Sequence, residues 1–291
     1  MIDGPDFIII GAMKCATSTL HQQLAANDGF CMSRPKEPNF FSDDAVWARG
    51  LDWYAGLFLA AQSGALRGES STHYTKLPTH PRALERLAAS VRTRRFIYVM
   101  RHPVERLVSH YIHEWSQGVI DEPLEQALDR HPELVAYGCY AMQLAPWLER
   151  FGRAAVLPVF MERLVAAPND ELARIGRFLG CERSPIWRAE LGAQNVSSER
   201  LRKAGVLDFV VRSPLLTTLR RALVPRSLRD RIKARWQMRQ RPDLSASTRS
   251  QLERTFDADL EMLGKWLGVP LSCASFHATA SERSWDWSER A

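Results

Sequence analysis

The chain has 291 residues, of which 45% are hydrophobic and 25% are charged. This mixture is typical of a globular protein and excludes a disordered or collagen-like chain. No apolar run approaches the ~20 residues that a membrane-spanning helix needs. The net charge of +6 is compatible with an anionic ligand, but it does not choose among nucleotide, polysaccharide, nucleic acid and membrane.

Cysteine usage and the amino terminus bear on the cellular compartment. Five cysteines are spread through the chain without a CxxC pair, which is typical of reduced thiols and predicts no zinc site. Asp3 and Asp6 stand where a secretory signal peptide would carry basic residues. We therefore expect a cytoplasmic protein that needs no metal, and the sequence leaves its oligomeric state open.

Short apolar runs alternate with helical patterns in the first third of the chain, which favours βαβ units and a parallel sheet. Residues 7–10 and 96–100 are rich in β-branched and aromatic side chains and predict two buried strands. Helices are expected over residues 17–26, 45–61 and 81–89.

Further elements are expected in the middle and last thirds of the chain. Pro103 opens a helix that should end before Gly118, because proline favours the first helical position and glycine the position past the last. Residues 154–160 predict a strand, and residues 169–179 and 245–267 predict helices. The expected fold is α/β, with three layers like a P-loop protein: a central, mainly parallel sheet flanked by helices, and extra helices in the C-terminal third.

One domain is expected over residues 1–275, followed by a loosely ordered tail over 276–291. Within this domain, residues 212–241 hold ten Arg or Lys and one acidic residue, with apolar residues spaced as on an amphipathic helix. The default interpretation is a solvated surface helix. The alternative is contact with an acidic or lipid-linked acceptor, or with an anionic membrane surface. Trp236 is the only aromatic residue among these arginines, so nucleic-acid binding is not expected.

A strand, a turn and a helix start follow one another over residues 7–20. The turn carries Lys14, and the hydroxyl residues Thr17, Ser18 and Thr19 open the helix. Free N–H groups, the helix dipole and an ammonium all favour an anion at such a place. The pattern is not a Walker A loop, because Met13 rather than glycine precedes the lysine. From these residues alone, a phosphate cradle and a turn whose hydroxyls merely cap the helix remain equal alternatives.

A second motif follows the strand at residues 96–100. Arg101 ends that strand, at the edge where ligands bind in open parallel sheets. Ser109 lies about two helical turns later, close enough to bracket one phosphate together with Arg101. Taken singly, each residue is more often an ordinary surface or helix residue, but their combination downstream of the candidate phosphate loop favours an anion site.

These motifs resemble those of sulfotransferases that use 3′-phosphoadenosine 5′-phosphosulfate (PAPS), in the branch of the heparan sulfate sulfotransferases and many bacterial relatives. The family binds the 5′-phosphosulfate in the loop after its first strand, which Lys14 and the segment Ala16-Thr17-Ser18-Thr19 match. Its 3′-phosphate site is an Arg and a Ser eight residues apart, which fall on Arg101 and Ser109. A late basic loop that closes on the same phosphate is loosely matched by Arg202 and Lys203.

Two further segments resemble the acceptor side of that family. Residues 34–42 match its K-E-x-x-F-F segment, whose glutamate, here Glu37, is the proposed general base. Residues 68–74 match its G-E-x-[ST]-x-x-Y segment, but Ser70 stands where heparan-type members commonly carry a second lysine, so acceptor recognition is expected to differ. His73 is a second candidate for acid–base work or acceptor contact, although a lone histidine is more often a structural hydrogen-bonding residue.

The resemblance implies in-line transfer of the sulfuryl group from PAPS to a hydroxyl or amine, with adenosine 3′,5′-bisphosphate as product and no metal. Lys14 would neutralise charge on the leaving phosphate while Glu37 takes the acceptor's proton. The acceptor is expected to be a small molecule, a glycan or a lipid-linked group. Two alternatives are a P-loop-type NTPase or small-molecule kinase, and a non-catalytic module that binds anionic glycans.

Overall fold

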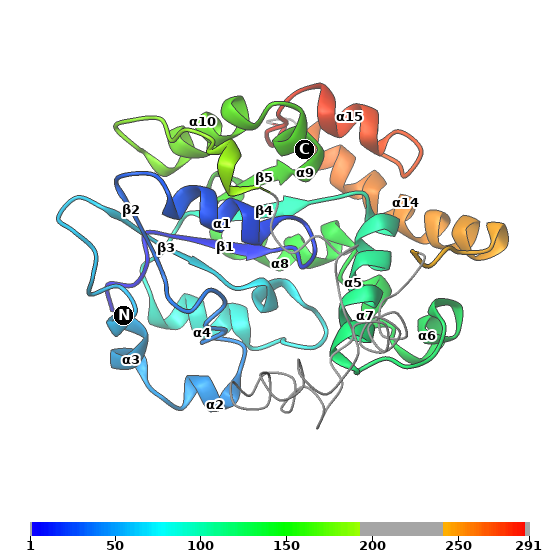
Figure 1. Ribbon diagram of the computed structural model, residues 1–291, viewed down its shortest axis with the longest axis horizontal. Helices are drawn as coiled ribbons and strands as arrows, with labels where there is room; N and C mark the ends of the chain where they lie inside the picture. The colour runs from blue at the N-terminus through cyan, green and yellow to red at the C-terminus, as the bar shows by residue number, and fades with distance from the viewer. Residues whose placement is uncertain (1, 193–240, 289–291) are drawn as a thin grey trace, which may run out of the picture.

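The computed structural model describes residues 2–192 and 241–288. Its centre is a five-stranded parallel sheet with the order β2-β3-β1-β4-β5, flanked by helices (Figure 1). The strands are β1 (Phe7–Gly11), β2 (Phe30–Met32), β3 (Leu66–Ser70), β4 (Phe96–Met100) and β5 (Val156–Phe160). The expected α/β fold with a parallel sheet is confirmed.

Helices connect the strands and cover the sheet. In the first half of the chain they are α1 (Thr17–Ala25), α2 (Asp44–Trp47), α3 (Leu51–Gly56), the 3₁₀ helix η1 (Thr72–Thr75), α4 (Ala83–Ser90) and α5 (Pro103–Gln117). Later come α6 (Leu124–Arg130), α7 (Glu133–Ala136), α8 (Tyr140–Phe151), η2 (Arg153–Ala155), α9 (Met161–Ala166), α10 (Pro168–Leu179), η3 (Ala189–Leu191), α14 (Ala246–Leu267) and α15 (Phe276–Glu282). None of the helices in these two described ranges combines the length and apolar character needed to cross a bilayer.

The strand order places a topological switch beside β1. The chain leaves β1 for β2 on one side of the sheet, returns through β3, and then crosses over β1 to reach β4 on the other side. All five strands are parallel, so the loops after β1, β2, β3 and β4 meet at one edge. In open α/β sheets this carboxyl edge is where ligands bind.

Complete burial explains why three of the strands were predictable. Every residue of β1, β4 and β5 is buried, so their sequences are continuous apolar runs rather than alternating ones. The helix after Pro103 ends at Gly118, which adopts φ 75°, as the sequence predicts. Gly180 ends α10 in the same left-handed conformation, with φ 74°.

The structure differs from expectation in two described segments. The helix expected over 45–61 is divided into α2 and α3, because Gly50 between them adopts φ 85° and breaks the helical path. The segment after Ser275, expected to be loosely ordered, forms α15, whose Phe276 is fully buried. Most of the basic stretch 212–241 lies outside the described residues.

Burial of Phe276 makes α15 part of the folded core. Its ring lies 5.5 Å from that of Phe160 and 5.7 Å from that of His102, measured between centroids. We expect Phe276→Ala to lower the free energy of unfolding by about 3–5 kcal/mol, because truncation leaves a cavity in a packed site. Denaturant unfolding measures this, with Leu59→Ala at an 84% exposed position as the control. Equal stability of the two variants would show that α15 is not docked.

Candidate active site

The loop between β1 and α1 has the geometry of an anion site. Lys14 and Ala16 adopt positive φ angles of 70° and 62°, and Ala16 is the N-cap of α1. Ala16, the N-cap residue of α1, has no side chain that could cap the helix, and the hydroxyl residues follow it inside the first turn. The interpretation in which these hydroxyls cap the helix from the N-cap position is therefore wrong. An uncapped helix N-terminus beside a lysine favours a bound anion.

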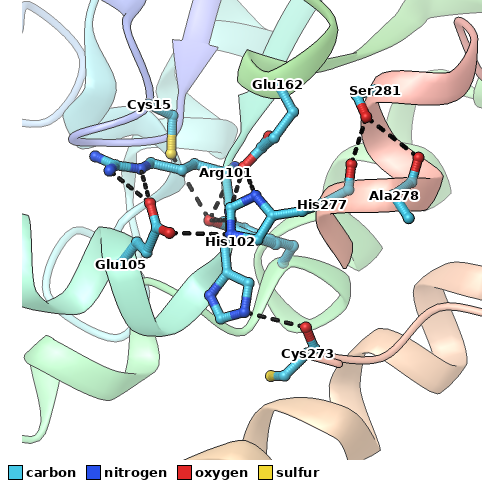
Figure 2. A network of polar contacts seen from close by, with 10 residues as sticks. Cys15, Arg101, His102, Glu105, Glu162, Cys273, His277, Ala278 and Ser281 are labelled. Atoms are coloured by element: carbon cyan, nitrogen blue, oxygen red, sulfur yellow. Dashed lines mark hydrogen bonds and ion pairs between the residues drawn. The ribbon is translucent and has the colours of Figure 1, made fainter. Parts of the chain in front are cut away.

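Arg101 lies at the end of β4 within a network of charged groups (Figure 2). Its Nη2 is 2.7 Å from Oε2 of Glu105, while Oε1 of the same carboxylate is 2.9 Å from Nε2 of His277. Burial opposes ionisation of Glu105, but the hydrogen bond and charge of Arg101 outweigh it and lower its pKa. Glu105 thus orients the guanidinium that the sequence assigns to a phosphate.

Tyr140 joins the Arg101 site to the loop after β1. Its hydroxyl donates to the carbonyl oxygen of Arg101 at 2.5 Å and accepts from the Arg101 backbone N–H at 3.2 Å. The same hydroxyl lies 3.7 Å from the sulfur of Cys15, and burial raises the pKa of that thiol to about 11. Ser109 is buried on α5, in the helix that begins just after Arg101. Sequence reasoning gave no role to Tyr140.

A buried carboxylate organises the β3 side of this sheet edge, across β1 from the Arg101 site. Glu69, in β3, is fully buried and accepts hydrogen bonds from the hydroxyls of Tyr54, Ser71 (2.6 Å) and Tyr74 (2.7 Å). The Ser71 hydroxyl also accepts from the backbone N–H of Asn39 at 3.0 Å. Glu69 therefore ties α3 and η1 to the loop that carries Glu37.

Glu37 is held at this edge by its backbone and by its carboxylate. Its N–H donates to the carbonyl of Ser70 at 2.8 Å, and its φ is 58°. The carboxylate contacts Lys36 Nζ at 2.5 Å and accepts from Thr72 Oγ1 at 3.3 Å. Burial raises the pKa of Glu37, but Lys36, Lys76 and His73 outweigh it and lower the pKa below its usual value. The carboxylate is therefore ionised and ready to accept a proton at neutral pH.

Two histidines near Glu37 are neutral. The ring of His73 stacks on that of His80, with centroids 4.5 Å apart, and burial together with Lys76 lowers the pKa of His73 to about 4. His73 Nδ1 is buried without a hydrogen-bond partner among the described residues. On α1, His21 Nδ1 lies 2.9 Å from the hydroxyl of Ser70, and burial with Lys36 lowers its pKa to about 4.

Lys76 is a charged residue at this edge that the sequence did not single out. It follows η1 and is only 8% exposed. Burial lowers its pKa to about 8, against the opposing effect of Glu37 and Glu114. It lies outside the matched motif of residues 68–74, so no pattern marked it.

The candidate residues therefore gather at the carboxyl edge of the sheet, on the loops after β1, β2, β3 and β4. Arg202 and Lys203 lie outside the described residues. Within residues 2–192 and 241–288, no group of three or more His, Cys, Asp or Glu side chains is arranged to hold a metal ion.

A parallel sheet whose switch point carries an anion-binding helix start defines a class of α/β proteins that bind phosphorylated ligands. The sulfotransferase domain model matches residues 4–207 of this chain. The chain therefore belongs to the sulfotransferase family. Membership in this family favours sulfuryl transfer over the alternatives of an NTPase or a small-molecule kinase.

Two relatives illustrate the similarity. The mouse (Mus musculus) heparan sulfate glucosamine 3-O-sulfotransferase 3B1 is 32% identical over 189 residues, which cover 62% of this chain and 47% of the relative. The membrane-associated sulfotransferase kil1 of Dictyostelium discoideum is 29% identical over 130 residues, 43% of this chain and 26% of the relative. The chain thus spans about half the length, or less, of these relatives.

A solved structure shares the fold. The sulfotransferase of Alicyclobacillus acidocaldarius superposes with a TM-score of 0.67 and 20% identity, covering 97% of this chain and 100% of that chain.

The buried carboxyl of Glu69 should make stability depend on pH. Its pKa is raised above the ordinary 4.5, mainly by burial. Above the unfolded-state pKa the folded protein holds this proton more tightly than the unfolded chain, so stability falls as pH rises toward the folded-state pKa. The free energy of unfolding of the wild type should fall by up to about 1.4 kcal/mol per pH unit in this range, and Glu69→Gln should remove this fall. Denaturant unfolding of both proteins from pH 4 to 7 tests this, and parallel profiles would contradict it.

Proposed function

We propose that this protein transfers the sulfuryl group of PAPS to a hydroxyl or amine of an anionic glycan. The observation that carries the proposal is the meeting of two unlike sites at one sheet edge. The start of α1 with Lys14 suits the donor's phosphates, and the ionised Glu37, on the loop after β2 and bonded to the end of β3, suits an acceptor's proton. Heparan sulfate sulfotransferase relatives support a glycan as acceptor.

The chain's residues fit PAPS at the donor side. Lys14 and the N–H groups at the start of α1 would hold the 5′-phosphosulfate, because both supply positive charge without a competing side-chain cap. Arg101 and Ser109 would hold the 3′-phosphate. Bound there, PAPS supplies a sulfuryl group activated by a phosphate leaving group.

The chain would contribute charge stabilisation and proton removal. Charge develops on the bridging oxygen as the S–O bond breaks, and Lys14 would stabilise it there, as lysines do in phosphoryl transfer. Glu37 would accept the proton of the acceptor hydroxyl. His73 is also unprotonated at neutral pH, so it is the competing candidate for the base. The partly exposed carboxylate of Glu37 and its place in the family's K-E segment favour Glu37.

The 3′-phosphate provides a test of the donor site. We expect adenosine 3′,5′-bisphosphate to bind at least tenfold more tightly than 5′-AMP, because a charge-assisted contact contributes roughly 1.5–3 kcal/mol. Arg101→Gln should abolish most of this preference. Calorimetry with both nucleotides measures it, with Arg249→Gln at an exposed site on α14 as the control. Equal affinity of the wild-type protein for the two nucleotides would remove the basis of the assignment.

Kinetics of three variants separate the donor cradle from the base. Lys14→Ala should abolish transfer and weaken PAPS binding, since the ammonium contacts the donor before and during transfer. Glu37→Gln keeps the shape of the side chain but cannot take a proton, so it should leave PAPS binding nearly unchanged and lower kcat by about 10² or more. His73→Ala should lower kcat less than Glu37→Gln does. The reverse order of the last two variants would identify His73 as the base.

A further inference from the structure

Lys76 occupies a rigid position beside the acceptor side of the site. Its carbonyl accepts from the N–H of His80 at 2.9 Å, and its own N–H donates to the carbonyl of His73 at 3.3 Å. The N–H of the next residue, Leu77, donates to Oε1 of Gln143 at 2.8 Å, and the carbonyl of Leu77 accepts from Nε2 of Gln143 at 2.9 Å. The backbone that carries Lys76 is therefore fixed by packing and hydrogen bonds.

The ammonium of Lys76 has an unusual setting for a buried charge. It lies 5.5 Å from the centre of the Tyr137 ring, and no carboxylate of the described residues comes within 4.0 Å of it. Glu37 and Glu114 attract it from further away, whereas Arg106 and Lys36 repel it. Burying a cation without a close counter-charge costs free energy. An anion that binds beside Lys76 would offset this cost by pairing with the ammonium.

Position 70 lacks the cation that heparan-type sulfotransferases commonly carry in the same segment. Ser70 is fully buried and its hydroxyl is engaged by His21, whose ring is neutral at physiological pH. Lys76 follows six residues later and acts electrostatically on the same carboxylate, Glu37. A positive charge is therefore present near Glu37, but it comes from a different position in the chain.

We propose that Lys76 binds an oxyanion of the acceptor, a carboxylate or a sulfate. The inference deepens the proposed function and depends on Glu37 marking the acceptor side. An oxyanion held at Lys76 would fix the acceptor relative to Glu37. The ring face of Tyr137 would stabilise the ammonium through a cation–π interaction.

Lys76→Met tests the proposal, because it keeps an unbranched side chain as far as Cε and removes the ammonium. Calorimetry would measure binding of heparan sulfate oligosaccharides in the presence of adenosine 3′,5′-bisphosphate, so that no turnover is needed. We expect the variant to bind the oligosaccharide about 10–100-fold more weakly, the effect of one charge-assisted contact, with nucleotide affinity unchanged. The matched control is Lys265→Met, an exposed residue of α14 paired with Glu261.

Chemically altered acceptors identify the group that Lys76 binds. If it is a carboxylate, carboxyl-reduced oligosaccharides should bind wild type and Lys76→Met equally; if it is a sulfate, desulfated ones should do so. If wild type still binds both altered oligosaccharides more tightly than Lys76→Met does, the proposal is overturned, since Lys76 would then act only through Glu37. In steady-state transfer the acceptor KM should rise while kcat changes less than threefold.

Two further outcomes separate this inference from its alternatives. Loss of a buried charge that has no close carboxylate among the described residues should leave the melting temperature of Lys76→Met unchanged or raised, whereas loss of a purely structural lysine would lower it. If wild type binds the nucleotide and transfers sulfuryl groups only to neutral acceptors, the assignment of Lys76 fails and sulfuryl transfer from PAPS stands. If wild type fails to discriminate the 3′-phosphate, the donor assignment fails instead.

Discussion

The hydrogen bonds to the buried carboxylate of Glu69 hold the loop that carries Glu37 in place. A fully buried carboxyl is costly unless hydrogen bonds satisfy it, and here three hydroxyls from α3, η1 and the end of β3 do so. One of those hydroxyls, that of Ser71, also holds the backbone of Asn39. The loop that carries Glu37 is thereby fixed to the sheet through a chain of hydrogen bonds that begins in the core.

Backbone strain is concentrated in the two loops that meet at the sheet edge. The non-glycine residues with positive φ among the described residues are Lys14, Ala16, Glu37 and Asn39. Each costs of order 1–3 kcal/mol and persists only where the surroundings enforce it. Glycine would remove the strain at positions 14 and 37, but it could supply neither an ammonium nor a carboxylate. The strain therefore accompanies an ammonium and a carboxylate placed on sharply turning backbone.

The sequence located the loops after β1 and β4 better than the segment around β3, for physical reasons. Strands β1 and β4 are buried apolar runs, so the positions just after them could be located directly. Strand β3 was missed because it contains Gly68, where a Cβ would lie 2.4 Å from Phe7, and the buried acid Glu69. Glycine and glutamate are depleted in strands, so this segment resembled a loop.

Long-range contacts explain the residues that no motif marked. Tyr140 and His277 reach the Arg101 site from distant parts of the chain, 39 and 172 residues from their partners Arg101 and Glu105. Lys76 is close in sequence to the G-E segment, but its burial depends on packing beside Tyr137. Such partners depend on how α7, α8 and α15 dock, and local pattern carries no information about docking.

The charges around Glu37 bear on its proposed role as the base. Lys36 and Lys76 lower its pKa, which keeps the carboxylate ionised but also makes it a weaker base. An acceptor oxyanion bound at Lys76 would screen that ammonium, so the pKa of Glu37 would rise toward its usual value. The carboxylate would then become more basic only when an acceptor with the right charge is in place. Acceptor recognition and proton removal would in this way be coupled through a single buried lysine.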